Sequence, residues 1–129
     1  MIANVTSIRT HASPQRIGFD GDFGAGLAEW HGDPVVVGDR IIAEMDCSEY
    51  CSFRQCDPDE SDTAWLPRCG VSVDGDSCVL VAKVVRVYDA GLVALDASGA
   101  TLVLDSPITL AAGAVVEIRT QHLQLHDAS

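Results

Sequence analysis

The chain is poor in basic residues: only eight of its 129 residues are Lys or Arg, and Lys83 is the single lysine. Binding to nucleic-acid phosphates requires clustered Lys and Arg, so this shortage argues against a nucleic-acid partner. The same shortage disfavours docking on anionic lipid. Asp and Glu number nineteen, and the formal net charge is −11. A charge of this size favours either a basic partner or a surface that is acidic only for solubility.

Long apolar runs are also missing. No stretch approaches the roughly 20 apolar residues of a membrane-spanning helix. Residues 1–14 lack the apolar core of a secretory signal peptide. We therefore expect a cytoplasmic protein that does not span a membrane. A hydrophobic content of 47% over 129 residues predicts one globular domain covering residues 1–129.

Catalytic motifs are absent as well, since no serine lies in a nucleophile elbow and no HExxH pattern occurs. His31 lies beside Trp30 and near Asp33 and could act as a general base, but no nucleophile stands at a known spacing from it. His122 and His126 precede the end of the chain and are interpreted as part of an exposed tail. We expect a protein that is not an enzyme.

The second half of the chain has a clear β pattern. Short apolar, β-branched segments are separated by glycine-containing turns, which predicts an antiparallel meander; the segments are residues 79–88, 92–96, 101–104 and 115–119. Val116 and Ile118 have the opposite parity to Leu123 and Leu125. Because side chains alternate along a strand, a bulge or bend near residues 120–122 is needed to bring both pairs into one core.

The first half is less regular. Residues 2–10, 16–19 and 35–45 are strand candidates, and residues 27–30 are expected to form a short helical turn. Residues 47–77 contain cysteines, acidic residues and turn formers without periodicity. Loops of this length inside a compact domain are uncommon and usually functional or mobile. We therefore predict an irregular insertion at about 47–77 and interpret it as functional.

These patterns together predict a mainly β fold. Seven or so short strands with little helix favour a small antiparallel barrel carrying a long Cys- and acid-rich loop. The layout is similar to that of oligonucleotide-binding-type or SH3-like barrels. A β-sandwich is the alternative.

Five cysteines form the most suggestive constellation. The candidate zinc ligands are Cys47, Cys51, Cys56 and Cys69, because thiolates at such spacings can complete a tetrahedral site and order a loop. Disulfides are a second interpretation, although five is an odd number. Plain thiols are a third, and Cys78, at the start of a strand, is then a small buried hydrophobe.

Acidic and aromatic residues coincide in the middle of the chain. Residues 20–76 contain fourteen Asp and Glu against three Arg, and six of the seven aromatic residues lie between residues 19 and 65. Aromatic rings fill pockets at interfaces, and charge steers the encounter. The predicted partner-binding residues are Trp30, Phe53, Asp57, Asp59, Glu60, Asp62 and Trp65.

The sequence therefore favours an acidic β-domain that binds, and inhibits, a basic protein. In size, acidity and expected cytoplasmic residence the chain resembles bacterial immunity proteins, which neutralise nuclease-type toxins. Two alternatives stay open: a zinc-stabilised accessory domain of a larger assembly, and a barrel that binds a small ligand.

Overall fold

A computed structural model of the protein describes residues 1–56 and 69–129. Strands make up 65% of these residues, which confirms the predicted mainly β fold. Among the described residues the one helical element is a 3-10 turn, η2 (Asp89–Gly91). The strands are β1 (Ile2–Thr10), β2 (Gln15–Gly21), β3 (Gly24–His31), β4 (Arg40–Cys47), β5 (Ser52–Cys56), β6 (Gly70–Asp74), β7 (Ser77–Val87), β8 (Leu92–Ala97), β9 (Ala100–Asp105), β10 (Val115–Thr120) and β11 (Leu123–Asp127).

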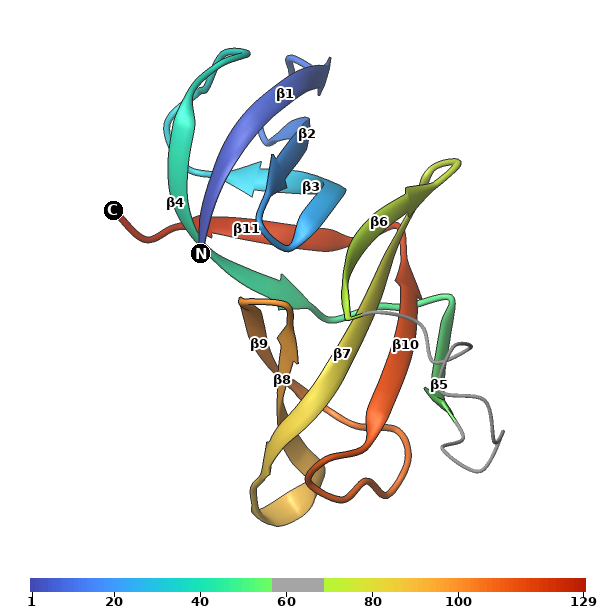
Figure 1. Ribbon diagram of the computed structural model, residues 1–129. Coiled ribbons are helices and arrows are strands. Elements are labelled where there is room, and N and C mark those ends of the chain that lie inside the picture. The colour runs from blue at the N-terminus through green and yellow to red at the C-terminus, as the bar shows by residue number, and fades with distance from the viewer. Residues whose placement is uncertain (57–68) are drawn as a thin grey trace.

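Five of these strands close into a small barrel (Figure 1). The first three strands form an antiparallel meander, β4 pairs with both β1 and β11, and β11 returns to pair with β3. The predicted barrel is thus confirmed, with one correction: the β3–β11 pair is parallel, so the barrel is mixed. Counted along the chain, the ring order is first, second, third, fifth, fourth.

The remaining strands form a sheet organised around the long strand β7. One edge of β7 pairs with β10, which pairs in turn with the edge strand β5. The other edge pairs first with β6 and then with β8, and β9 follows β8. The predicted meander is therefore correct for β7, β8 and β9. It is wrong for β10, which lies beside β7 instead of β9.

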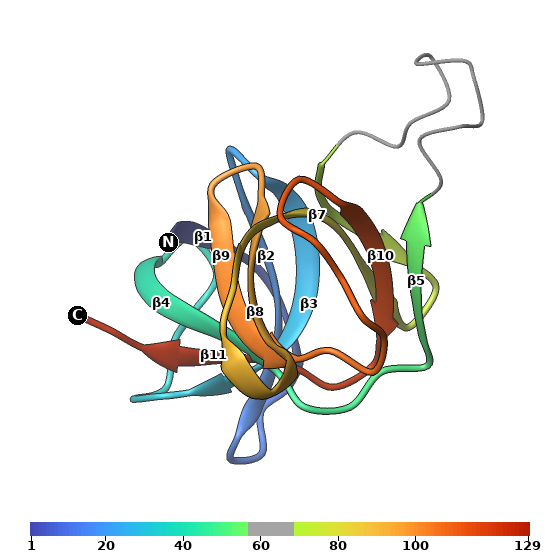
Figure 2. The same ribbon diagram turned by 90° about the horizontal axis from the view of Figure 1, so that it is seen from below.

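One continuous hydrophobic core joins the barrel and the sheet. Figure 2 shows the strands of both parts from below. Val5 and Leu125 contribute from the barrel, and Leu80, Leu95 and Ile118 contribute from the sheet. All five are almost fully buried. In residues 1–56 and 69–129, no helix is long and apolar enough to cross a membrane.

The bend predicted near residues 120–122 is present and connects the two parts. β10 ends at Thr120 in the sheet and β11 begins at Leu123 in the barrel, and the apolar residues on both sides are buried. The buried Thr120 hydroxyl donates a hydrogen bond to the Glu49 carbonyl and accepts one from the His122 amide. Because both polar functions are satisfied, the corner is fixed without leaving an unpaired buried group.

Three local predictions are corrected. Residues 27–30 belong to β3, and residues 35–39 form a turn before β4 rather than its first half. The irregular segment predicted at 47–77 contains β5 and β6 at its two ends. These strands are specified by pairing with β10 and β7, distant in sequence, which local periodicity does not report.

Candidate functional site

A polar face covers the outside of the barrel where β3, β11 and β4 lie side by side. Inward residues of these strands, such as Trp30, Leu125 and Met45, are buried. Their neighbours in sequence point outward because strand side chains alternate. The register places Gln124 between Glu29 and Asp46, and His126 between His31 and Glu44. We call these six residues the histidine–carboxylate face.

Contacts within this face join its two histidines to carboxylates. The rings of His31 and His126 stack with centroids 4.9 Å apart. The Nε2 atom of His31 lies 2.8 Å from Glu29 Oε1, a close contact without the geometry of a directed hydrogen bond. The Nε2 atom of His126 lies 4.0 Å from Asp46 Oδ2. Neither imidazole is hydrogen-bonded to a hydroxyl or thiol of the described residues.

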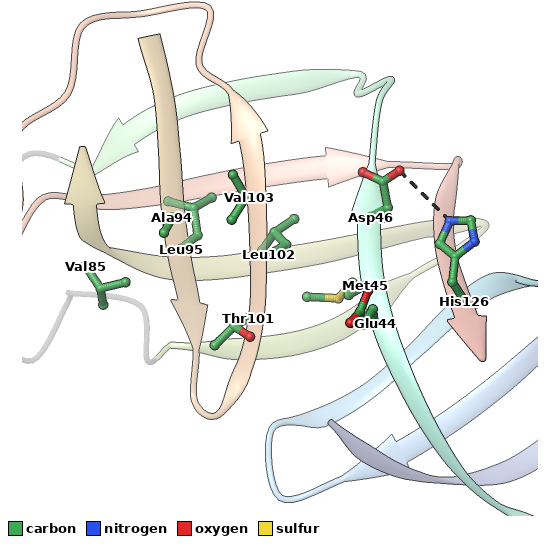
Figure 3. A pocket seen from close by; sticks show the side chains of 10 residues that line it. All are labelled: Glu44, Met45, Asp46, Val85, Ala94, Leu95, Thr101, Leu102, Val103 and His126. Carbon is green, nitrogen blue, oxygen red and sulfur yellow. Dashed lines mark ion pairs between the residues drawn. The ribbon is translucent and has the colours of Figure 1, made fainter. Parts of the chain in front are cut away.

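A groove runs beside this face, between β4 and β9, with a volume of about 570 Å³ (Figure 3). One wall carries Glu44 and Asp46 from β4, with His126 behind them. The opposite wall is mainly aliphatic and comes from the sheet: Val85, Ala94 and Val103. Val85 is 52% exposed and Val103 is 48% exposed. The groove therefore sets carboxylates against accessible aliphatic side chains.

The groove continues into a smaller hollow of about 260 Å³ that shares Asp46 and Val103 with it. This extension is lined by residues 46–48 on one side and by Val103, Leu104 and Asp105 on the other. Tyr50 closes it, since its hydroxyl donates a 3.3 Å hydrogen bond to the Asp105 carbonyl. Together the two hollows follow β4 and its continuation over residues 44–48, alongside residues 101–105 of β9.

A register shift in β7 contributes to the aliphatic wall. Val84 pairs with Leu95 and Arg86 pairs with Ala94, so Val85 is an extra residue. Such a bulge redirects a side chain. Val84 is fully buried in the core, whereas Val85 projects into the groove. The bulge thus adds a third aliphatic group to the row formed by Ala94 and its cross-strand partner Val103.

The predicted partner-binding residues have different positions. Trp30 is 3% exposed and its Nε1 donates a hydrogen bond to the Asp33 carbonyl. Its ring therefore belongs to the barrel core, which corrects its assignment as an anchor for a partner. Phe53 is half-buried and contacts the ring of Tyr50 at a centroid distance of 5.3 Å. The other predicted residues, Asp57, Asp59, Glu60, Asp62 and Trp65, lie outside the described residues.

All five cysteines lie in the described residues, and none of them forms a disulfide. Cys47 and Cys56 are buried at the ends of their strands, Cys51 is exposed, and Cys69 is half-buried. Within the part of the chain that the structure describes, no three His, Cys, Asp or Glu side chains lie close enough together to hold a metal ion. Zinc binding by Cys47, Cys51, Cys56 and Cys69 stays a prediction.

Burial raises the pKa of the Cys78 thiol from 9.0 to about 11, and a hydrogen bond to the Leu27 backbone opposes this only in part. The folded state holds the thiol proton more tightly than the unfolded state does. The protonated Cys78 thiol therefore favours the folded state fully below pH 9, and this contribution to stability is lost as the pH rises toward 11. Between pH 8 and 11 the wild type should lose about 2 kcal/mol more unfolding free energy than Cys78→Ala. Urea unfolding at both pH values measures this difference, and equal losses would contradict it.

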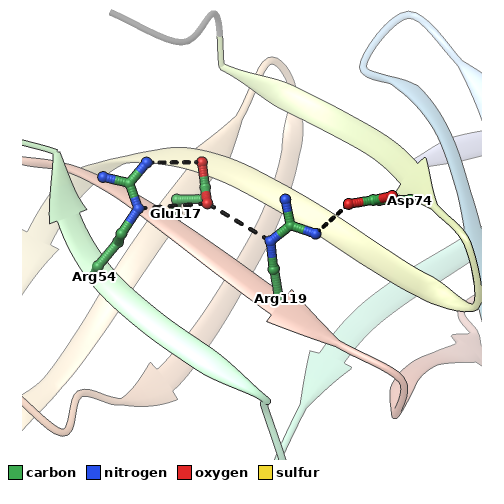
Figure 4. A network of polar contacts seen from close by, with 4 residues as sticks. All are labelled: Arg54, Asp74, Glu117 and Arg119. Carbon is green, nitrogen blue, oxygen red and sulfur yellow. Dashed lines mark hydrogen bonds and ion pairs between the residues drawn. The ribbon is translucent and has the colours of Figure 1, made fainter.

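Two of the chain's few basic residues form ion pairs on the sheet, outside the groove. On the sheet, Arg54 pairs with Glu117 at 3.1 Å, and Arg119 pairs with both Asp74 and Glu117 (Figure 4). The network links β5, β10 and β6, and because both arginines are exposed, solvent screens each pair and keeps its contribution to stability small. Among the described residues, neither hollow between β4 and β9 is lined by a Lys or an Arg. Within the described lining, the carboxylates of the groove thus meet no Lys or Arg, and the basic side chain beside them is that of His126.

Sequence reasoning missed the groove residues Glu44, Asp46 and His126. The sequence pattern predicts an exposed tail at His126, whereas His126 lies on β11, which closes the barrel. The one local signal was the alternation of Leu123 and Leu125 with polar residues, which is typical of a half-buried strand. Nothing in the sequence indicates that β4 lies beside β9. The two strands are far apart in the chain and are not hydrogen-bonded neighbours.

The chemistry of the groove suits a ligand that is both cationic and aliphatic. Carboxylates bind guanidinium and ammonium groups through charge-assisted hydrogen bonds. Accessible Val side chains gain free energy when an apolar group covers them. No protein-family model matches the chain, and comparisons with curated proteins and with solved structures gave no match.

Proposed function

We propose that this protein is a non-enzymatic binding domain for a basic protein, and that the groove between β4 and β9 is where the partner docks. The observation that carries the proposal is the composition of the groove. Glu44 and Asp46 face an aliphatic wall, and among the described residues no Lys or Arg lines the space between. A basic partner is the complement of such a surface.

Net charge supports the same proposal. At −11 the protein attracts cationic proteins over a distance limited by the ionic strength. The acidic residues Asp57, Asp59, Glu60 and Asp62 add to this field wherever they lie. If the partner uses its Arg and Lys to contact phosphate, occupying those side chains blocks its activity. Inhibition of a basic, phosphate-binding enzyme, in the manner of an immunity protein, is therefore part of the proposal.

Native mass spectrometry of the protein isolated gently from its own host tests the proposal. We expect a basic protein to be retained, because a groove of this polarity binds its partner most tightly at low salt. With the retained partner in hand, Glu44→Gln/Asp46→Asn should weaken binding at least about tenfold, since hydrogen bonds to charged groups contribute roughly 1.5–3 kcal/mol each. Surface plasmon resonance at two salt concentrations measures this effect.

Asp22→Asn/Asp76→Asn is the matched control, because it removes the same net charge from exposed turn residues outside the groove. It should slow association slightly and leave dissociation unchanged. Charge reversal at Asp57, Asp59 and Glu60 measures separately what the acidic stretch adds to the association rate. A protein recovered without any partner, or equal affinities for the groove and control variants, would overturn the proposed function.

A further inference from the structure

The spacing of the two carboxylates in the groove indicates the shape of the segment that binds there. Glu44 and Asp46 are two residues apart on β4, with the buried Met45 between them. In a strand, positions two apart project on the same side and are separated by roughly 6.7 Å. In a second strand lying alongside, side chains two positions apart are separated by the same distance. Basic side chains at alternate positions of an extended segment therefore match the two carboxylates.

The opposite wall has a single aliphatic centre. Along β9 the outward residues are Thr101, Val103 and Asp105, so Val103 is flanked by polar groups. Ala94 and Val85 extend this centre along the groove wall, across β8 and β7. Because Asp46 and Val103 border both hollows, the aliphatic centre lies where the two hollows meet. One aliphatic side chain of the occupant can cover it.

We infer that the occupant is an extended segment of the partner with the order basic–aliphatic–basic. Neighbouring side chains of an extended segment leave the backbone in opposite directions. Two basic side chains then reach Glu44 and Asp46, while the residue between them points to Val103. A helix would place residues three or four apart on one face, so this alternation between walls favours a strand. The inference rests on the proposed function and specifies the partner's binding motif.

Two capped peptides of identical composition test the motif: Gly-Arg-Val-Arg-Gly and its isomer Gly-Arg-Arg-Val-Gly. Both carry two positive charges, so general electrostatic attraction is the same for each. We expect the alternating peptide to bind about fivefold more tightly to the wild-type protein, because only it covers Val103 while pairing both carboxylates. Amide chemical-shift titrations by NMR measure both dissociation constants and locate the affected residues.

Val103→Thr provides the second measurement. It keeps a β-branched side chain at a half-exposed strand position and so should preserve folding. The preference for the alternating peptide should fall to less than about twofold in this variant, since the aliphatic contact is lost.

Equal affinities of the two peptides for the wild type, or a preference unchanged by Val103→Thr, would overturn the inference. If both peptides bind with equal affinity and Glu44→Gln/Asp46→Asn lowers both affinities equally, the acidic groove is still the binding site and only the extended motif is contradicted. Binding of neither peptide would also overturn the motif, while the proposed function is still judged by the complex isolated from the host.

Discussion

Gly24→Ala should destabilise the protein by at least about 3 kcal/mol, a large part of the 5–15 kcal/mol typical of a folded domain. Gly24 has φ +117°, a conformation that costs a residue with a side chain about 1–3 kcal/mol. A Cβ atom there would also approach the carbonyl oxygen of Val71 to well inside van der Waals contact. The obstacle is backbone, so it can be relieved only by moving β3 away from β6, which meet at this residue.

Gly38→Ala is the matched control for this substitution. Gly38 also has a positive φ, +94°, but a Cβ atom there would meet nothing within 4 Å. It should therefore show only the conformational cost, about 1–2 kcal/mol. Urea unfolding followed by circular dichroism measures both variants. Equal losses of stability for Gly24→Ala and Gly38→Ala would show that contact with Val71 is not what requires glycine at position 24.

Leu125→Ala should cost about 3–4 kcal/mol, within the range for large-to-small substitutions in a core. Leu125 is fully buried and lies between Trp30 of β3 and Met45 of β4 in the strand register. Removing its side chain leaves a cavity at the point where the barrel closes. Thermal and urea unfolding measure the loss.

Gln124→Ala, one position earlier, is the control because Gln124 lies on the outer face, where substitutions change stability by no more than about 0.5 kcal/mol. The contrast between two neighbouring residues tests whether residues 123–127 form a strand of the barrel. Similar, small effects of both substitutions would mean that this segment is the exposed tail its sequence position suggests.

Much of the fold follows from local pattern. The strands of the second half could be located because their apolar residues are continuous and glycines separate them. The corner at Thr120 could be placed because Ile118 and Leu123 have opposite parity yet are both apolar. Each of these signals lies within a few residues, where alternation is a direct consequence of strand geometry.

What the sequence could not supply depends on pairing between distant segments. β5 and β6 have few apolar residues and become strands by pairing with β10 and β7. Trp30 lies in an acidic, glycine-rich context that suggests a surface position, but β3 turns its ring into the core. The candidate groove joins β4 to β9, more than fifty residues later in the chain, so no local pattern contains it.

The parallel pair of β3 and β11 bears on how the chain folds during synthesis. Four of the five barrel strands lie within residues 2–47, whereas the fifth, β11, lies at Leu123–Asp127. During synthesis the edges of β3 and β4 that pair with β11 therefore stay open until β11 has left the ribosome. Contacts across such separations form slowly, and open strand edges promote aggregation meanwhile. The sheet strands β5 to β10 are complete before β11, so the barrel strands β1 to β4, although made before the sheet, are enclosed after it.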